Sequence, residues 1–236
     1  MSNVDDAAVA TYPALAVEEE RSFLTRVMGW MCLGLAVTAV IAWAIGTSDR
    51  AVTWVSDHPL VFIGLIIAQL VLVGALALRV SKMTPAVAAG VFLLYAALNG
   101  ITFSLIFAVY TTTSIVSTFL ITSAMFGALG LFGWTTKRDL SSLGSIAFMA
   151  LFGLIAASIV NLFWANTTLY WVTTYAGVAI FSALTAYDMQ KIKQINVRGN
   201  TGTDEDKREA IIGALTLYLD FINLFLFLLR IFGRER

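Results

Sequence analysis

Runs of about twenty apolar residues, separated by short polar breaks, recur along almost the whole sequence. An α-helix needs that length to cross about 30 Å of hydrocarbon, because it rises about 1.5 Å per residue. Barrel strands would be about half as long, so the runs predict transmembrane helices. Reading them against the polar breaks gives seven candidate spans: 27–46, 60–78, 86–108, 115–134, 145–164, 171–192 and 211–232.

The composition excludes several functional classes. Only 13% of the 236 residues are charged and 59% are hydrophobic, whereas soluble domains are about one quarter charged. A net charge of zero without a basic patch argues against nucleic-acid binding. The single cysteine, Cys32, and the single histidine, His58, leave no disulfide, zinc motif or nucleophile–base set. The sequence therefore predicts no enzymatic activity and no bound cofactor.

The chain outside the spans is short, so the sequence predicts one domain. Residues 27–232 form its transmembrane part, and residues 233–236 form a short basic C-terminal tail. Residues 1–26 lack the basic start, apolar stretch and cleavage site of a signal peptide. We expect them to be a disordered N-terminal tail on the cytoplasmic side.

Basic residues predict the orientation, because Lys and Arg are retained on the cytoplasmic side of a membrane. Most of the fifteen Lys and Arg residues fall on the same side of the membrane as the N-terminus. Only Arg50 lies in a loop on the opposite side. Arg230, Arg234 and Arg236, at the end of the chain, conflict with this rule if the last span crosses completely. The sequence allows either a seventh full crossing with a basic external tail or a last segment that enters and returns.

Asp188 and Asp220 are the acidic residues that fall inside predicted spans. A charged side chain at the bilayer centre costs at least about 2.5–3.5 kcal/mol, and such residues commonly mark ion or proton pathways. Asp220 lies roughly 14 Å from the cytoplasmic end of its span and Asp188 about 6 Å from the cytoplasmic end of its own, so the two meet if the sixth span extends toward Ile195. At about 4 Å their repulsion would be about 4 kcal/mol, and the pair would share one proton. The alternative is a structural role, in which both only tie two helices together.

Other polar residues are candidates for the same pathway. Arg79 closes the second span on the side of Asp188, where it is either an ion-pair partner or a membrane-flanking cation. Four neutral residues within spans either line the pathway or make interhelical hydrogen bonds: Asn99, Ser104, Tyr218 and Asn223. Small residues at helical spacing in the fourth span predict a close helix contact: Gly127, Gly130 and Gly133.

Four motifs resemble those of the Bax inhibitor-1, or transmembrane Bax inhibitor motif, family in its bacterial inner-membrane branch. They are Leu98-Asn99-Gly100-Ile101-Thr102, Thr135-Thr136-Lys137-Arg138-Asp139-Leu140, Thr185-Ala186-Tyr187-Asp188 and Leu217-Tyr218-Leu219-Asp220-Phe221. The resemblance covers nearly the whole chain from about Arg21. It implies an all-α integral membrane protein, a seven-helix bundle with the seventh helix central.

The resemblance also implies a function. Asp188 and Asp220 would form a pH-sensing pair that gates a passive calcium leak, with both carboxylates as transient calcium ligands and Arg79 as a latch on Asp188. The partners would then be the lipid bilayer, calcium ions and protons. Two other functions stay open: a regulatory partner of a membrane protease, whose aspartates only hold the fold, and a proton-coupled secondary transporter.

Overall fold

The chain is helical almost throughout. The computed structural model describes residues 3–195 and 202–236, and within these ranges the only β-pairing is an isolated bridge between Tyr110 and Glu235. The α-helices are α1 (Asn3–Gly46), α2 (Asp49–Asp57), α3 (Pro59–Arg79), α4 (Pro85–Phe103), α5 (Ile106–Val109), α6 (Thr112–Thr135), α7 (Ser141–Trp164), α8 (Thr167–Ile195) and α9 (Asp204–Phe232), with a short 3-10 helix, η1 (Val80–Lys82), after α3.

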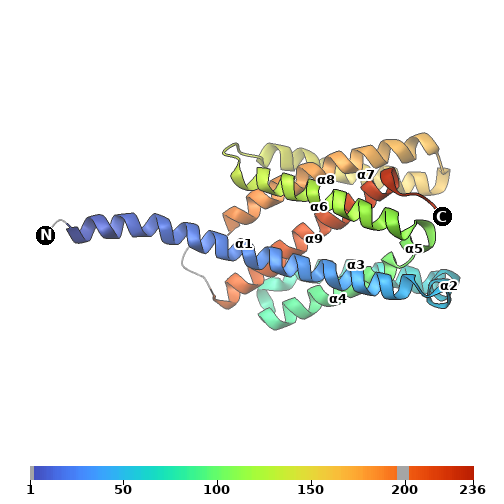
Figure 1. The fold of residues 1–236 in the computed structure, drawn as a ribbon, viewed down its shortest axis with the longest axis horizontal. Helices are drawn as coiled ribbons and strands as arrows, with labels where there is room; N and C mark the ends of the chain where they lie inside the picture. The colour runs from blue at the N-terminus through green and yellow to red at the C-terminus, as the bar shows by residue number, and fades with distance from the viewer. Residues whose placement is uncertain (1–2, 196–201) are drawn as a thin grey trace.

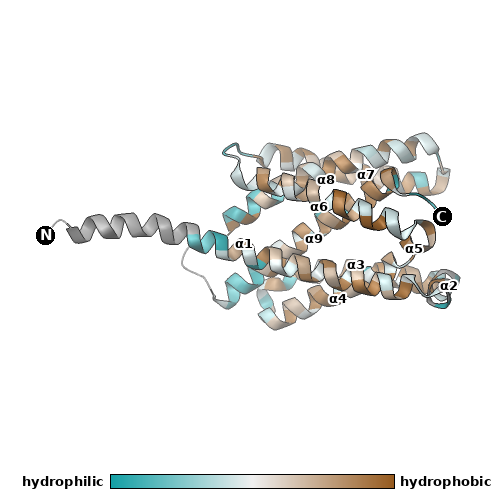
Figure 2. Cartoon of the chain, viewed as in Figure 1, coloured by the Kyte–Doolittle hydropathy of each residue, from teal (hydrophilic) through white to brown (hydrophobic). Residues whose placement is uncertain are grey.

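Seven of the helical segments are long and apolar enough to cross a membrane, as the sequence predicts. They are α1, α3 with η1, α4 with α5, and α6 to α9. Figure 2 shows apolar residues concentrated in the middle of the bundle and polar residues gathered toward its two ends. This distribution matches a hydrocarbon layer between two aqueous sides, so the chain is an all-α, multi-pass membrane protein.

The last helix crosses completely. At 29 residues, α9 is about 43 Å long, more than the roughly 30 Å of hydrocarbon. The two ends of the chain lie at opposite ends of the bundle (Figure 1). The structure therefore selects the seventh full crossing with its basic tail on the far side, and the alternative of a returning segment is wrong.

Helix starts follow local sequence signals. Pro59 and Pro85 occupy the first turns of α3 and α4, where the missing N–H costs nothing. Thr84, Thr111 and Thr203 cap α4, α6 and α9, each accepting a backbone hydrogen bond with its side chain. Most helix boundaries lie within a few residues of the predicted spans, but α1 and α9 begin well before theirs.

The first helix begins much earlier than predicted. Residues 3–26, expected to be disordered, are helical and continuous with the first span. Phe23 is only 2% exposed and Val27 is fully buried, so the helix is already packed in the core before the predicted start of the span. The error arose because Arg21 and Arg26 break the apolar run in sequence. In the structure Arg21 is exposed, and the Arg26 guanidinium lies 5.9 Å from the centre of the Phe23 ring, so neither charge prevents the helix from packing in the core.

Helix α9 is the centre of the bundle. In its most apolar 18-residue stretch 67% of the residues are buried inside the protein, against 6% in α3. It packs against α1, α4, α6 and α8, while α3 packs on α4 and α7 packs on α8. The central seventh helix implied by the family resemblance is thereby confirmed.

Two of the three glycines of the fourth span provide the close contact between α6 and α8. A Cβ atom at Gly133 would collide with the backbone carbonyl of Ala186, and one at Gly130 would lie 3.0 Å from the Met189 Cε atom. A Cβ atom at Gly127 would meet no other atom within 4 Å, and this glycine is exposed. The predicted contact therefore uses Gly133 and Gly130, and Gly127 plays no part in it.

We expect Gly133→Ala to destabilise the protein by about 1–3 kcal/mol, because the backbone of α8 cannot move aside as a flexible side chain could. Gly127→Ala is the matched control on the same helix, where the added methyl group meets open space and alanine favours the helix by up to about 1 kcal/mol. Thermal unfolding in detergent micelles measures both. Equal melting temperatures for the two variants would contradict the packing role of Gly133.

Candidate functional site

The two intramembrane aspartates meet. The side chains of Asp188 in α8 and Asp220 in α9 line the same cavity and lie close enough to interact electrostatically, although they are 32 positions apart in the sequence. Helix α8 continues to Ile195, which brings Asp188 further into the membrane than the shorter predicted span did. The structure thus brings together the two residues that the sequence singled out.

Both aspartates line one cavity, which lies between α7, α8 and α9 and has a volume of about 610 Å³. Its polar lining consists of the two carboxyl groups with Ser158, Thr216 and Asn223. The remaining lining side chains are apolar: Phe148, Leu151, Leu154, Ile155, Ile159, Leu162, Phe181, Leu184, Leu219 and Phe227. Several of those on α7 are exposed on the lipid-facing surface, so the cavity reaches the side of the bundle.

The environment of the pair makes two negative charges costly. Asp220 is 4% exposed, and its Oδ2 atom receives no hydrogen bond from a donor group in the described part of the chain. The cation that acts on Asp188 is Lys191, on the same helix. Two carboxyl groups form a hydrogen bond only when one of them carries a proton, because ionised carboxylates are acceptors only. The geometry therefore suits a pair that holds one proton between its members.

Asn223 is the other predicted pathway residue found in this cavity. It lies one helical turn after Asp220, and its Nδ2 atom donates to the backbone carbonyl of Leu219 at 2.8 Å. Residues three or four apart in a helix share a face, so Asn223 follows Asp220 into the cavity. Its amide supplies a neutral oxygen beside the carboxyl pair.

Tyr218 does not line the cavity, contrary to the sequence-based expectation. Its hydroxyl forms a 2.7 Å hydrogen bond with Thr38 of α1, and its ring packs edge-on against Phe92 and Tyr95 of α4. Two positions along a helix are separated by about 200° of rotation, so Tyr218 and Asp220 point to opposite sides of α9. Tyr218 is a buried packing residue of the α1–α4–α9 contact.

Asn99 and Ser104 also lie outside the cavity. Both are buried at the α4 side of the bundle, where Asn99 donates to the carbonyl of Tyr95 and Ser104 donates to the carbonyl of Ile101. Neither residue is among those that line the space around the aspartates. Their hydrogen bonds stay within their own helix, so their polar groups are satisfied locally.

The predicted latch is not formed in this structure. Arg79 is exposed at the end of α3, which packs on α4, whereas Asp188 belongs to α8. No ion pair joins the two side chains among residues 3–195 and 202–236. Both residues lie at the same end of their predicted spans, but position along a span does not determine which helices are neighbours.

A buried ion pair that was not predicted from the sequence joins the middle of α1 to the start of α9. The Arg26 Nη2 atom contacts both carboxylate oxygens of Asp206 at 2.8 Å, and the backbone N–H of Gly202 donates to the same carboxylate. Asp206 is fully buried, although it lies outside the predicted spans. The spacing Thr203-x-x-Asp206 resembles a capping box, and that signal could have identified Asp206 as part of a helix start.

A second missed residue, Gln190, anchors the Thr135–Leu140 motif beside the aspartate helix. Its Oε1 atom accepts a hydrogen bond from the backbone N–H of Leu140, and its Nε2 atom donates to the carbonyl of Arg138. In the same loop, hydrogen bonds from Ser141 lower the pKa of the exposed Asp139 carboxyl. The motif thus holds α8 in position two residues after Asp188.

In the part of the chain that the structure describes, no group of three or more His, Cys, Asp and Glu side chains is arranged to hold a metal ion. A cation at the Asp188–Asp220 pair would be bound by two carboxylates and by neutral oxygens of the cavity, such as that of Asn223. Oxygen ligands of this kind suit hard cations such as calcium.

Comparison with known proteins adds to this geometry. The family model described as "Inhibitor of apoptosis-promoting Bax1" matches residues 20–236. The chain is 48% identical to the inner membrane protein YbhL of Escherichia coli K12 over 217 residues, which cover 92% of this chain and 93% of that protein. It is 40% identical to a protein of Borreliella burgdorferi (92% and 94% covered) and 37% identical to one of Deinococcus radiodurans (93% of each).

Proposed function

Since this chain belongs to the Bax inhibitor-1 family of multi-pass membrane proteins, we propose that it is a passive, pH-gated leak pathway for calcium ions. The proposed location is a bacterial inner membrane, with the N-terminus in the cytoplasm. The orientation is supported by the basic residues, because the loops on the N-terminal side carry most of them. The location is supported by the similarity to a protein named as an inner membrane protein.

The observation that carries the proposal is the carboxyl pair in a cavity at membrane depth. Asp220 lies near the middle of α9, where burying a charged side chain costs free energy that an apolar side chain would not. A proteinaceous cavity of about 610 Å³ surrounds it, with oxygen atoms from four different residue types: Asp, Asn, Ser and Thr. Such a site has room for a partly hydrated cation and for the exchange of water molecules.

In this mechanism the protonation state of the Asp188–Asp220 pair controls the flux. Carboxylates bind calcium only when ionised, whereas a pair that holds a shared proton is hydrogen-bonded across α8 and α9. Loss of that proton leaves two like charges that repel each other and attract a divalent cation. Full protonation in acid removes the ligands, so flux falls when both carboxyl groups are protonated.

The test is calcium flux into liposomes that contain the purified protein and no other. We expect influx down the calcium gradient, without an added energy source, at a rate that changes with pH and falls in acid. Liposomes without protein give the background. Flux at the background level at every pH would contradict the proposal and favour a regulatory partner of a membrane protease. Uphill movement driven by a proton gradient would instead indicate a transporter.

A further inference from the structure

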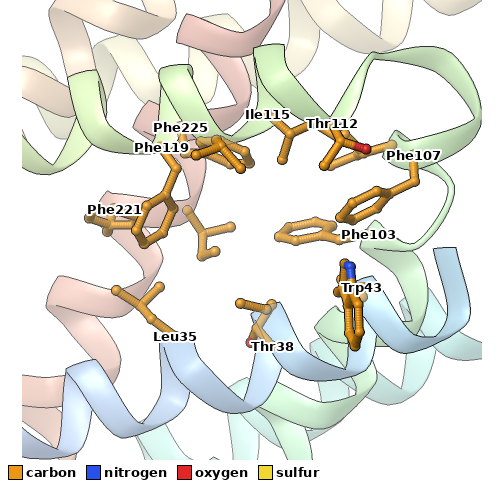
Figure 3. A pocket seen from close by; sticks show the side chains of 15 residues that line it. Leu35, Thr38, Trp43, Phe103, Phe107, Thr112, Ile115, Phe119, Phe221 and Phe225 are labelled. Carbon is orange, nitrogen blue, oxygen red and sulfur yellow. The ribbon is translucent and has the colours of Figure 1, made fainter. Parts of the chain in front are cut away.

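A second cavity lies on the other side of α9 and shares no residue with the aspartate site. It has a volume of about 260 Å³ and lies between α1, α6 and α9, with α4 and α5 at one end. Figure 3 shows Leu35, Thr38 and Trp43 of α1 facing Ile115 and Phe119 of α6 across it. Phe221 and Phe225 of α9 complete the wall.

The cavity is apolar along most of its length. The Thr38 hydroxyl donates to the carbonyl of Ala96 and pairs with the hydroxyl of Tyr218, so its hydrogen-bonding capacity is used elsewhere. The other lining side chains with polar atoms are Trp43 and Thr112. Trp43 is three residues from the end of α1, and Thr112 is the first residue of α6. Both polar side chains therefore lie at one end of the cavity, the end nearer the membrane surface that faces away from the N-terminus.

The cavity opens toward the lipid. Trp43 is 58% exposed and Val116 is 53% exposed, although both line the cavity and belong to spanning segments. The medium outside Val116 is hydrocarbon, and an apolar cavity of about 150 Å³ is already large enough to stay dry and bind benzene. The molecule available to fill this space is a lipid acyl chain.

Basic residues stand at the same end as the polar atoms. The C-terminal tail turns back onto the start of α6: the backbone N–H of Thr111 donates to the carbonyl of Arg234, and the N–H of Arg234 donates to the Ser114 hydroxyl. The N–H of Arg236 donates to the carbonyl of Val109. These bonds hold the backbone of Arg234 and Arg236 beside the start of α6. Both side chains are exposed, and guanidinium groups pair well with phosphate.

We propose that this cavity binds one acyl chain of a membrane phospholipid, whose phosphate lies at Arg234 and Arg236. The apolar length of the cavity accommodates the chain, and Trp43 and Thr112 are placed at the level of the ester groups. The basic C-terminal tail lies on the side of the membrane where the positive-inside rule does not expect basic residues. Binding a lipid phosphate would give this tail a role there. This site is independent of the aspartate pair and of ion flux.

Native mass spectrometry of the detergent-purified protein tests the proposal. We expect the wild type to retain one phospholipid and Ala42→Leu to lose it, because Ala42 lines the cavity and is buried. Ala44→Leu is the matched control on α1, since Ala44 is exposed and does not line the cavity. On α6, Val116→Phe narrows the lipid-side opening, and Ile121→Phe is its exposed control. The α6 pair keeps the test decisive if Ala42→Leu fails to fold.

A second measurement separates the headgroup from the chain. After delipidation, the protein is given either a phospholipid or a free fatty acid of equal chain length, and occupancy is compared. We expect preferential retention of the phospholipid, and loss of that preference in Arg234→Gln/Arg236→Gln. Unchanged occupancy in both cavity variants would overturn the proposal, and so would equal loss in the cavity variants and their controls. An unchanged preference in the double variant would overturn the role of the two arginines.

Discussion

Replacing Asp220 by asparagine is expected to remove the shared-proton step from the pH dependence of calcium flux while the protein remains folded. The amide is nearly the same size as the carboxyl group, so the packing of α9 is kept. It carries no titratable proton, so the pair with Asp188 can no longer alternate between a shared-proton state and a doubly ionised state. The site also loses one of its two anionic ligands, and the calcium flux through it should fall at every pH.

The assay is the liposome flux measurement across a range of pH, with folding checked by size-exclusion chromatography. Thr216→Val is the matched control, because Thr216 lines the same cavity and its hydroxyl donates to the carbonyl of Ile212 on its own helix. This control changes the lining without changing a titratable group, and it should keep the pH profile of the wild type. A wild-type profile in Asp220→Asn would remove the aspartate pair from the mechanism.

Replacing Arg26 by methionine is expected to lower the free energy of unfolding by about 3 kcal/mol. The change leaves the fully buried Asp206 carboxylate without its cation, and breaking one side of a buried ion pair typically costs about 3–5 kcal/mol. The lower end of that range applies because the Arg26 side chain is 31% exposed and water can reach it. Denaturant unfolding in detergent micelles measures the difference.

Two further variants test the cause of this loss. Arg79→Met removes an exposed arginine that has no ion pair in residues 3–195 and 202–236, and it should change the stability by less than about 0.5 kcal/mol. Arg26→Met/Asp206→Asn removes both charges, and it should recover part of the stability because no buried charge is left unpaired. If Arg26→Met is as stable as Arg79→Met, the ion pair does not hold α1 to α9.

Hydropathy and length were sufficient to place the membrane-spanning helices. A span must contain enough apolar residues to cross the hydrocarbon, and its backbone must satisfy its own hydrogen bonds. Both conditions act within one continuous segment, so they can be read without knowing its neighbours. The same logic identified Asp188 and Asp220, because an acid within such a segment is conspicuous in any arrangement of helices.

Contacts between side chains of different helices depend on how the helices are arranged, and the sequence does not show that arrangement. Periodicity shows that Tyr218 and Asp220 occupy different faces of α9, but only packing shows that one face meets α1 and α4 and the other meets α8. Packing likewise separates Arg79 from Asp188 and buries Asp206 against Arg26. The spans share one apolar composition, and lipid solvates any apolar face almost as well as another helix does. Contacts between helices therefore depend on shape, small residues and individual polar pairs, which only the tertiary structure brings together.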